Sequence, residues 1–297
     1  MGNCVGTPGG CPPAAGPKPP WLKRRLPQGE AYGRVQALIA RGRLHTVCQE
    51  ARCPNLWECY ARNTATFLIL GDRCTRDCRF CAVASGPPAP PDPGEPERVA
   101  RAAAAMGLSY VVITSVTRDD LADGGAAHFA ATIAAVRRLL PQARVEVLIP
   151  DFQGRPEALL TVIRAAPDVI NHNVETVPRL YPQVRPQADY RRSLEVLSRV
   201  AASGIPAKSG LMLGLGERAA EVRSVLEELR RAGCRILTLG QYLQPSPAHL
   251  PVAAWVPPGE FAAWRRLALA IGFAEVASAP LVRSSYRAER SFEALGR

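Results

Sequence analysis

Short apolar runs alternate with longer amphipathic segments along most of the chain. The apolar runs are rich in β-branched residues, which is typical of buried strands, and they lie at 66–70, 110–115, 145–149, 169–173, 207–213 and 236–242. The segments between them carry apolar residues at helical spacing, and they lie at 97–106, 126–140, 156–165, 190–203 and 219–232. A further short helix is predicted at 32–43. Repeated strand-helix units predict a parallel sheet with right-handed crossovers.

The number of units bears on the fold class. Six units favour an α/β fold of the partial (β/α)6 TIM-like barrel type, because a complete barrel requires eight strands. An open doubly wound sheet is the alternative. Both architectures place ligand sites at the carboxyl ends of the strands.

The chain divides into four predicted parts. Residues 1–30 are rich in Pro and Gly and predict a flexible tail, and residues 31–63 form an N-terminal extension with the first cysteine group. Residues 64–275 form the barrel, and residues 276–297 form a C-terminal extension. The chain has neither an apolar run of about 18 residues nor a signal-like N-terminus, so we expect no membrane contact and a cytoplasmic location.

The charge indicates an acidic partner. The net charge is +11, and nearly all of the 37 basic residues are Arg, spread along the chain. Aromatic residues make up only 6%, which argues against a platform that stacks nucleic-acid bases. We therefore expect a protein or a small anion as the partner, and no nucleic acid.

Nine cysteines in a chain without secretion signals favour metal binding or catalysis over disulfides. Cys4 and Cys11 fall in the predicted tail. Cys234 directly precedes an apolar run and is predicted to be a buried thiol that packs as a small apolar side chain. The other six form two triads.

The second triad along the chain is Cys74, Cys78 and Cys81, directly after the first predicted strand. Three thiolates hold three irons of a four-iron cubane and leave the fourth iron open to a ligand. Zinc is the competing interpretation, but zinc sites usually pair cysteines with a second pair or with histidines farther away.

The first triad is Cys48, Cys53 and Cys59, with gaps of four and five residues. These gaps differ from those of ferredoxins, and no fourth thiol lies nearby. The two triads therefore predict two separate metal centres.

Several further motifs carry a resemblance that covers about residues 44–290. They are 65–71, 114–121, 123–125, 172–181, 208–217, 240–246 and Arg283-Ser284-Ser285-Tyr286. In their order around the two triads, these stretches resemble the lipoyl synthase family of the radical S-adenosylmethionine (SAM) superfamily. The chain departs from the usual family residue at four positions, Arg79, Thr117, Gln187 and Arg218, where the family has Pro, Asp, Gly and Thr.

The resemblance implies a radical SAM barrel with two [4Fe-4S] clusters. Cys74, Cys78 and Cys81 would carry the cluster that cleaves SAM to a 5′-deoxyadenosyl radical. Cys48, Cys53 and Cys59 would carry an auxiliary cluster that donates sulfur. The reaction implied is insertion of two sulfur atoms at C6 and C8 of a protein-bound octanoyl-lysine.

The resemblance also implies a serine as the fourth ligand of the auxiliary cluster. In an extended segment Ser284 and Ser285 point to opposite sides, so only one can bind iron. Ser285 is predicted and Ser284 is the alternative. The predicted catalytic residues are thus Cys74, Cys78, Cys81 and Ser285.

Other polar residues near strand ends are candidates for structural roles or for SAM contacts. Ser115, Asn173 and Glu175 are candidates to contact SAM, although a cap or loop hydrogen bond is the simpler role for each. His172 is expected to be a satisfied structural histidine. Lys208 begins an apolar strand, so it requires a carboxylate or phosphate partner.

The implied partners are octanoylated carriers, namely a glycine-cleavage H protein or the E2 domain of a 2-oxoacid dehydrogenase. An electron donor such as ferredoxin or flavodoxin and an iron-sulfur carrier protein are also implied. The alternatives are a biotin-synthase-like sulfur-inserting enzyme and a non-catalytic metal or redox protein.

Overall fold

An open, strongly curved sheet forms the centre of the protein. The computed structural model describes residues 16–23 and 30–296. The sheet has the strand order β1-β2-β5-β6-β7-β8-β9-β10. The strands are β1 (His45–Thr46), β2 (Thr66–Ile69), β5 (Tyr110–Ser115), β6 (Arg144–Leu148), β7 (Val169–Asn171), β8 (Ala207–Leu213), β9 (Ile236–Gln241) and β10 (Glu275–Ser278). All neighbours pair in parallel except β1, which runs antiparallel to β2.

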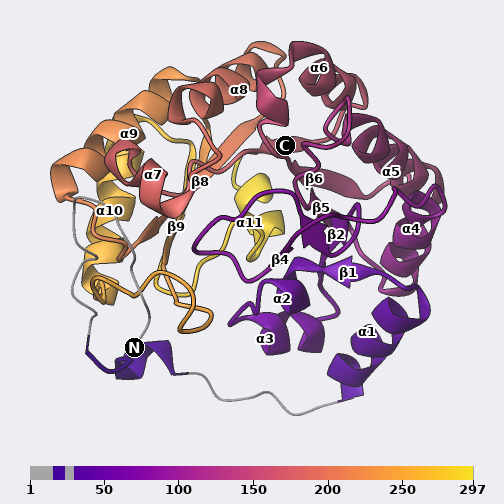
Figure 1. The fold of residues 1–297 in the computed structure, drawn as a ribbon, viewed down its shortest axis with the longest axis horizontal. Coiled ribbons are helices and arrows are strands. Elements are labelled where there is room, and N and C mark those ends of the chain that lie inside the picture. The colour runs from indigo at the N-terminus through magenta and orange to yellow at the C-terminus, as the bar shows by residue number, and fades with distance from the viewer. Residues whose placement is uncertain (1–15, 24–29, 297) are drawn as a thin grey trace.

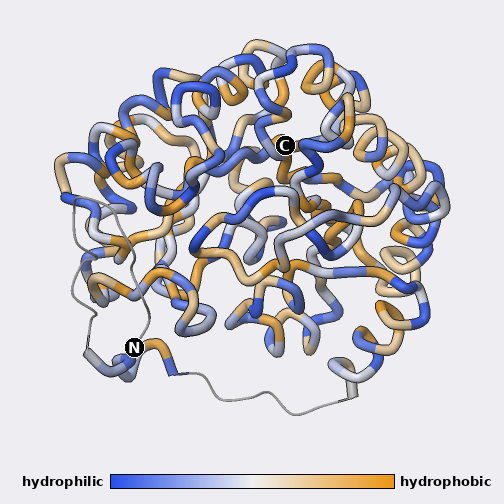
Figure 2. Tube along the Cα trace, viewed as in Figure 1, coloured by the Kyte–Doolittle hydropathy of each residue, from blue (hydrophilic) through white to orange (hydrophobic). Residues whose placement is uncertain are grey.

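Helices surround the outside of this sheet, as Figure 1 shows. They are α4 (Glu95–Ala105), α5 (Ala126–Leu139), α6 (Pro156–Arg164), α8 (Tyr190–Ala202), α9 (Ala219–Arg231) and α10 (Pro258–Ile271). Each buries one face against the strands; α9, for example, buries Val222, Val225, Leu226 and Leu229. The apolar colouring in Figure 2 gathers on the strands and on such inner faces. Burial of these faces drives the assembly of the barrel.

Further helices and strands lie beside the barrel or at its ends. They are α1 (Glu30–Arg41), α2 (Val47–Glu50), α3 (Leu56–Ala61), β3 (Arg73–Cys74), β4 (Ala84–Ser85), α7 (Tyr181–Val184) and α11 (Ala288–Glu293). In Figure 1, α2 and α3 lie between the two ends of the curved sheet, and α11 lies inside the ring. Phe292 of α11 packs on Val169 and Ile236, the first residues of β7 and β9. The helix therefore closes the barrel at the amino ends of its strands.

The predicted partial barrel is confirmed, with two additions to the sheet. All six predicted strands are present, although β7 ends at Asn171 and so leaves Asn173 beyond the strand. The edge strands β1 and β10 were missed because they are short and only partly buried. The helix α10 was also missed, since Pro257, Pro258 and Gly259 are typical of a loop; yet a proline fits the first turn of a helix without strain.

Part of the predicted flexible tail packs on the body of the protein. Leu22 is buried, and the indole Nε1 of Trp255 donates to the carbonyl oxygen of Gly16 at 2.7 Å. Residues 16–23, within the predicted tail, therefore contact the body of the protein in this structure. Cys4 and Cys11 lie outside the described residues. In the described part of the chain, no helix is both long and apolar enough to span a bilayer.

A buried ion pair lies inside the barrel near the amino ends of the strands. The ammonium Nζ of Lys208 lies 2.8 Å from Glu146 Oε1, and both side chains are almost completely buried. The hydroxyl of Tyr110 donates to the other carboxylate oxygen at 2.8 Å. This carboxylate is the partner that the sequence required for Lys208.

We expect Lys208→Met to lower the free energy of unfolding by about 3–5 kcal/mol, because it leaves the Glu146 carboxylate buried and unpaired. The double variant Lys208→Met/Glu146→Leu should recover most of that loss. Urea unfolding measures both effects. Arg223→Ala, which breaks an exposed pair with Glu227, is the control and should cost about 0.3–0.5 kcal/mol. A loss below about 1 kcal/mol for Lys208→Met would contradict the proposed importance of the pair.

Candidate active site

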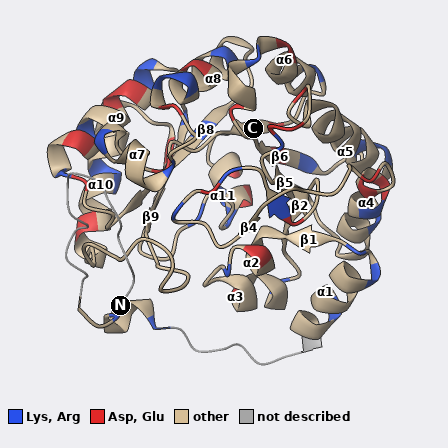
Figure 3. Cartoon of the chain, in the orientation of Figure 1, with Lys and Arg blue, Asp and Glu red and all other residues tan. Residues whose placement is uncertain are grey.

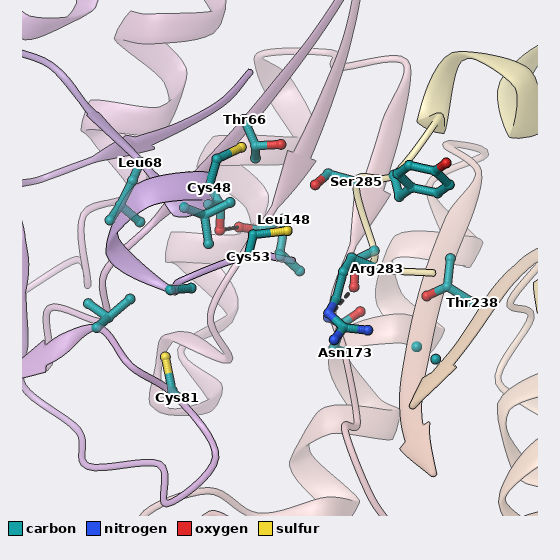
Figure 4. Close-up of a pocket in the computed structure, with 18 of the residues that line it drawn as sticks. Cys48, Cys53, Thr66, Leu68, Cys81, Leu148, Asn173, Thr238, Arg283 and Ser285 are labelled. Atoms are coloured by element: carbon teal, nitrogen blue, oxygen red, sulfur yellow. Dashed lines mark hydrogen bonds between the residues drawn. The ribbon is translucent and has the colours of Figure 1, made fainter. Parts of the chain in front are cut away.

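A cavity of about 640 Å³ opens at the carboxyl ends of the barrel strands. Both cysteine triads line it, together with the predicted residues Ser115, Asn173, Glu175 and Ser285. Figure 4 shows several of these side chains on opposite walls of the cavity. The fold thus brings together residues that are widely separated in sequence.

Backbone amides make several hydrogen bonds in the loop with Cys74, Cys78 and Cys81. The sulfur of Cys74 accepts from the amides of Arg76 and Thr117, at 3.4 and 3.3 Å. The amide of Cys81 donates to the carbonyl oxygen of Cys78 at 2.9 Å. Amides that point at a ligating sulfur stabilise the thiolate and tune a cluster bound there.

Arg76 fixes this loop to the ends of β5 and β6. Its guanidinium makes two hydrogen bonds to Asp119, at 2.6 and 3.0 Å, and one to Asp151 at 2.6 Å. Arg192 reaches the other carboxylate oxygen of Asp151 at 3.3 Å. Burial by itself raises the pKa of Asp151, but the hydrogen bond and the charge of Arg76, together with the amide of Gln153 and His172, outweigh burial and hold the pKa well below its usual range. Asp151 and Arg76 therefore both stay charged.

Two departures from the family pattern add bonds to the same loop. The amide of Arg79 donates to the carbonyl oxygen of Val184 at 3.0 Å, a bond that a proline could not make. The side-chain oxygen of Gln187 accepts from the amide of Asp77 at 3.1 Å, which a glycine could not do. Both bonds join the loop to residues 184–187.

The first triad lies on short elements that precede β2. Cys48 lies in α2, Cys59 lies in α3, and Cys53 lies in the turn between them. The hydroxyl of Thr46 caps α2 by accepting from the amide of Gln49. Burial, and to a smaller extent the neighbouring thiol of Cys53, raises the pKa of Cys48 and of Cys59 to about 12.

The chemistry of the six thiols fits two iron-sulfur clusters. All six are free, and the pKa of Cys48 and of Cys81 is raised in part by the other two thiols of its triad, so the thiols of each triad lie near one another. Among the described residues, no three His, Cys, Asp or Glu side chains converge on a point that a single metal ion could occupy. A cubane does not require such convergence, because each thiolate binds a different iron.

The segment with Ser284 and Ser285 lines the cavity on the wall opposite the cysteines that Figure 4 labels. Asn173 Nδ2 donates to Ser284 Oγ at 2.6 Å, so Ser284 faces the barrel. In Figure 4 the hydroxyl of Ser285 points toward the side where Cys48 and Cys53 lie. A side chain at Gly240 would clash with the carbonyl oxygen of Val282, so only glycine lets this segment lie so close to β9.

Unsatisfied polar atoms mark the part of the cavity nearest the barrel. Ser115 Oγ, Asn173 Oδ1 and Arg185 Nε are buried without a hydrogen-bond partner. Burying such atoms costs folding free energy unless a ligand or a water molecule forms hydrogen bonds with them. Arg185 was not among the predicted residues. It lies just after the short helix α7, and nothing in its local sequence indicates that its side chain turns inward to reach the carbonyl oxygens of Asn173 and Val174.

His172 is structural, as predicted. Its Nδ1 lies 2.9 Å from the carbonyl oxygen of Ile149, and its Nε2 lies 3.0 Å from Ser193 Oγ. Burial lowers the pKa of His172 to about 4, so the ring is neutral at physiological pH. Cys234 is a fully buried thiol outside the cavity, also as predicted.

Comparisons with known proteins identify the family. The profile of the Radical SAM superfamily matches residues 68–239, and that of the N-terminal domain of lipoyl synthase matches residues 16–53. Among solved structures, methylornithine synthase (PylB) aligns with a TM-score of 0.52 at 13% identity, over 89% of this chain and 86% of that one. Streptococcus suis SuiB bound to S-adenosylmethionine aligns at 0.54 and 13% identity, over 73% of this chain and 51% of that one. These two likenesses show the fold alone.

Curated relatives are much more similar in sequence. Lipoyl synthase from Methylococcus capsulatus is 58% identical over 283 residues, which is 94% of this chain and 88% of the relative. Lipoyl synthase from Acidithiobacillus ferrooxidans is 56% identical over 94% of this chain and 89% of the relative. Lipoyl synthase from Caldicellulosiruptor saccharolyticus is 54% identical over 92% of this chain and 97% of the relative.

The barrel, the three-thiol loop at its carboxyl end and the matching profile define a radical SAM enzyme, a class that uses SAM and a [4Fe-4S] cluster. Within that class, the chain belongs to the lipoyl synthase family. It therefore has the function of that family, as a radical SAM enzyme that inserts sulfur.

We expect Arg76→Leu to lower the free energy of unfolding by about 3–5 kcal/mol, because it leaves Asp119 and Asp151 without their shared cation. Iron content after reconstitution should fall as well, since the loop loses its anchor. Urea unfolding and iron analysis measure the two effects. The control is Arg79→Ala in the same loop, whose exposed side chain should contribute less than about 0.5 kcal/mol. Equal effects of the two variants would contradict the anchoring role.

Proposed function

We propose that this chain inserts sulfur at C6 and C8 of a protein-bound octanoyl-lysine, using one cluster at each cysteine triad. The observation that carries the proposal is that two sets of three free thiols line one cavity at the carboxyl end of a radical SAM barrel. A radical enzyme with a single cluster requires only one such set. The second set supports a separate source of sulfur within reach of the same substrate.

The SAM-binding centre would be held by the second triad, Cys74, Cys78 and Cys81. When bound there, a [4Fe-4S] cluster supplies the electron that cleaves SAM reductively, and its fourth iron is open to the nucleotide. The chain's own contribution is positioning. The amides of Arg76 and Thr117 stabilise the Cys74 thiolate, and the ion pairs of Arg76 fix the loop relative to β5 and β6.

Ser115, Asn173 and Glu175 would bind SAM beside this centre. The unpaired atoms Ser115 Oγ and Asn173 Oδ1 can accept hydrogen bonds from its hydroxyl or amino groups. Arg185 adds a positive charge near Cys78 and Glu175, which suits the carboxylate of SAM. These contacts would orient SAM and exclude water from the reacting carbon.

The auxiliary centre would be held by Cys48, Cys53, Cys59 and Ser285. A serine oxygen is a harder ligand than a thiolate and matches iron-sulfur sites less well. A weak fourth ligand suits a cluster that must be dismantled to release sulfur. The guanidinium of Arg283 lies close enough to Cys53 to oppose the effect of burial on the pKa of that thiol, and so it favours the thiolate form.

The remaining part of the cavity would accommodate the octanoyl chain. Its inner wall is apolar, with Leu68, Val112, Leu148 and Leu211 from four different strands or their ends. The carrier would be a glycine-cleavage H protein or the E2 domain of a 2-oxoacid dehydrogenase. Ferredoxin or flavodoxin would supply electrons, an iron-sulfur carrier protein would rebuild the auxiliary cluster, and the reaction would take place in the cytoplasm.

Cys78→Ala and Cys53→Ala should separate the two centres. Cys78→Ala should form neither 5′-deoxyadenosine nor product, because loss of one thiolate removes the SAM-binding cluster. Cys53→Ala should still form 5′-deoxyadenosine but no lipoyl product, with about four irons per chain in place of about eight. The assay is anaerobic incubation of an octanoylated carrier domain with SAM and a reductant. Chromatography detects the nucleoside, and mass spectrometry detects the added sulfur.

Cys234→Ala is the matched control, because Cys234 is buried but lies outside the cavity. It should retain both products and the full iron content. Wild-type SAM cleavage by Cys78→Ala would overturn the assignment of the second triad, and lipoyl product from Cys53→Ala would overturn that of the first. Zinc in place of iron in the isolated protein would favour a non-catalytic metal protein.

Association with the carrier domain should slow as salt rises, because the net charge of +11 attracts an acidic partner. Figure 3 shows basic residues spread over the outer helices among acidic ones. We therefore expect the net charge of the whole protein, rather than one basic patch, to attract the carrier domain. Stopped-flow association rates at about 0.01 and 0.15 M ionic strength, where the Debye length falls from about 30 to 8 Å, test this. A neutral octanoyl peptide is the control and should show little change. Equal rates for the carrier at both salt concentrations would instead indicate an apolar docking surface.

A further inference from the structure

Residues 281–287, which we call the bridging segment, contact both halves of the cavity. On the auxiliary side, Asn55 Nδ2 donates to the carbonyl oxygen of Leu281 at 2.7 Å, and the hydroxyl of Tyr286 donates to Glu58 Oε1 at 2.7 Å. Asn55 and Glu58 lie between Cys53 and Cys59 in sequence. On the barrel side, Ser284 accepts the hydrogen bond from Asn173. The bridging segment therefore connects the part of the chain that carries the first triad to a predicted SAM contact.

The amide of Asn173 has both of its N–H donors in use. One reaches Ser284 Oγ at 2.6 Å, and the other reaches Glu175 Oε1 at 3.0 Å. The remaining polar atom, Oδ1, is buried without a partner, and Asn173 lines the cavity. The side chain can therefore only accept a hydrogen bond from a ligand while these two bonds are in place.

The space beside this amide is kept open by Gly210 in β8. A side chain at Gly210 would clash with Thr238 Oγ1 and would lie 3.1 Å from Asn173 Oδ1. No side chain at position 210 therefore packs against the amide, and on this side its orientation depends on its hydrogen bonds. Glu175 alone would hold one N–H, so Ser284 supplies the second point that fixes the plane of the amide.

We infer that Ser284 is a positioning residue that couples SAM binding to the seating of the bridging segment. By holding Asn173 Nδ2, it turns Oδ1 toward the nucleotide; by the same bond, it holds Ser285 in place beside the first triad. Coupling between two sites is reciprocal, so SAM that binds at Asn173 stabilises the bridging segment to the same extent. This inference rests on the proposed SAM site and extends it to a link between the two centres.

The first test measures equilibrium binding of SAM to the iron-loaded protein by calorimetry, without reductant so that nothing turns over. Ser284→Ala should raise the Kd about two- to tenfold, as expected for the loss of one hydrogen bond. Ser284→Thr keeps the hydroxyl and should restore the affinity to within about twofold. In a double-mutant cycle, Ser284→Ala should have no further effect once Asn173 is already Ala.

The second test measures amide hydrogen exchange in residues 282–287. SAM should slow exchange there in the wild-type protein and in Ser284→Thr, but not in Ser284→Ala. A purely structural serine would change exchange equally with and without SAM. Ser278→Ala is the matched control, because it removes a serine bond to the carbonyl oxygen of Phe261 outside the cavity, and it should leave both the Kd and the effect of SAM unchanged.

The outcomes separate this inference from the function on which it rests. If wild-type protein with its full iron content binds no SAM, the proposed SAM site is wrong. If wild-type protein binds SAM and Ser284→Ala has the same Kd and the same SAM-dependent protection, the site stands and the coupling is overturned. Additive effects of Asn173→Ala and Ser284→Ala would also overturn it, because they would show that Ser284 acts through another residue.

Discussion

The ion pairs of Arg76 are the interaction on which the candidate active site most depends. They fix a loop with little regular structure, in which three thiols must keep their places, to the ends of two parallel strands. Removing two carboxylates and a guanidinium from water is costly, and it is offset only when all the partners are present. The network therefore holds the loop in the conformation that a cluster requires before any metal binds. This lowers the conformational-entropy cost of ordering the loop when the metal binds.

A second constraint is that two centres made from distant parts of the chain must share one cavity. The barrel brings the strand ends together, while α2 and α3 occupy its open side and carry the first triad there. The bridging segment then joins the two walls through Asn55 on one side and Asn173 on the other. Its close approach to β9 is possible only because Gly240 has no side chain.

Much of this was predictable from the sequence because strand burial and cysteine spacing are local patterns. The six central strands and the two triads are of this kind. The inward orientation of Arg185 and the carboxylate partners of Arg76 could not be predicted. The carbonyl oxygens and carboxylates that these arginines contact come from distant parts of the chain and are brought near only by the fold. The strand β10 was missed for a related reason: it has one fully buried residue, so its pairing with β9 rather than its composition makes it a strand.

The C-terminal segment has a consequence for how the protein is made. Residues 283–285 lie at the carboxyl ends of the barrel strands, whereas Phe292 in α11 packs at their amino ends. A few residues therefore pass from one end of the barrel to the other and contribute both to the cavity wall and to the barrel floor. Because they follow β10 in sequence, a ribosome delivers them after all the barrel strands. Nascent chains halted before this point would lack the floor and the serine together, so incomplete molecules would be open at both ends and exposed to proteases.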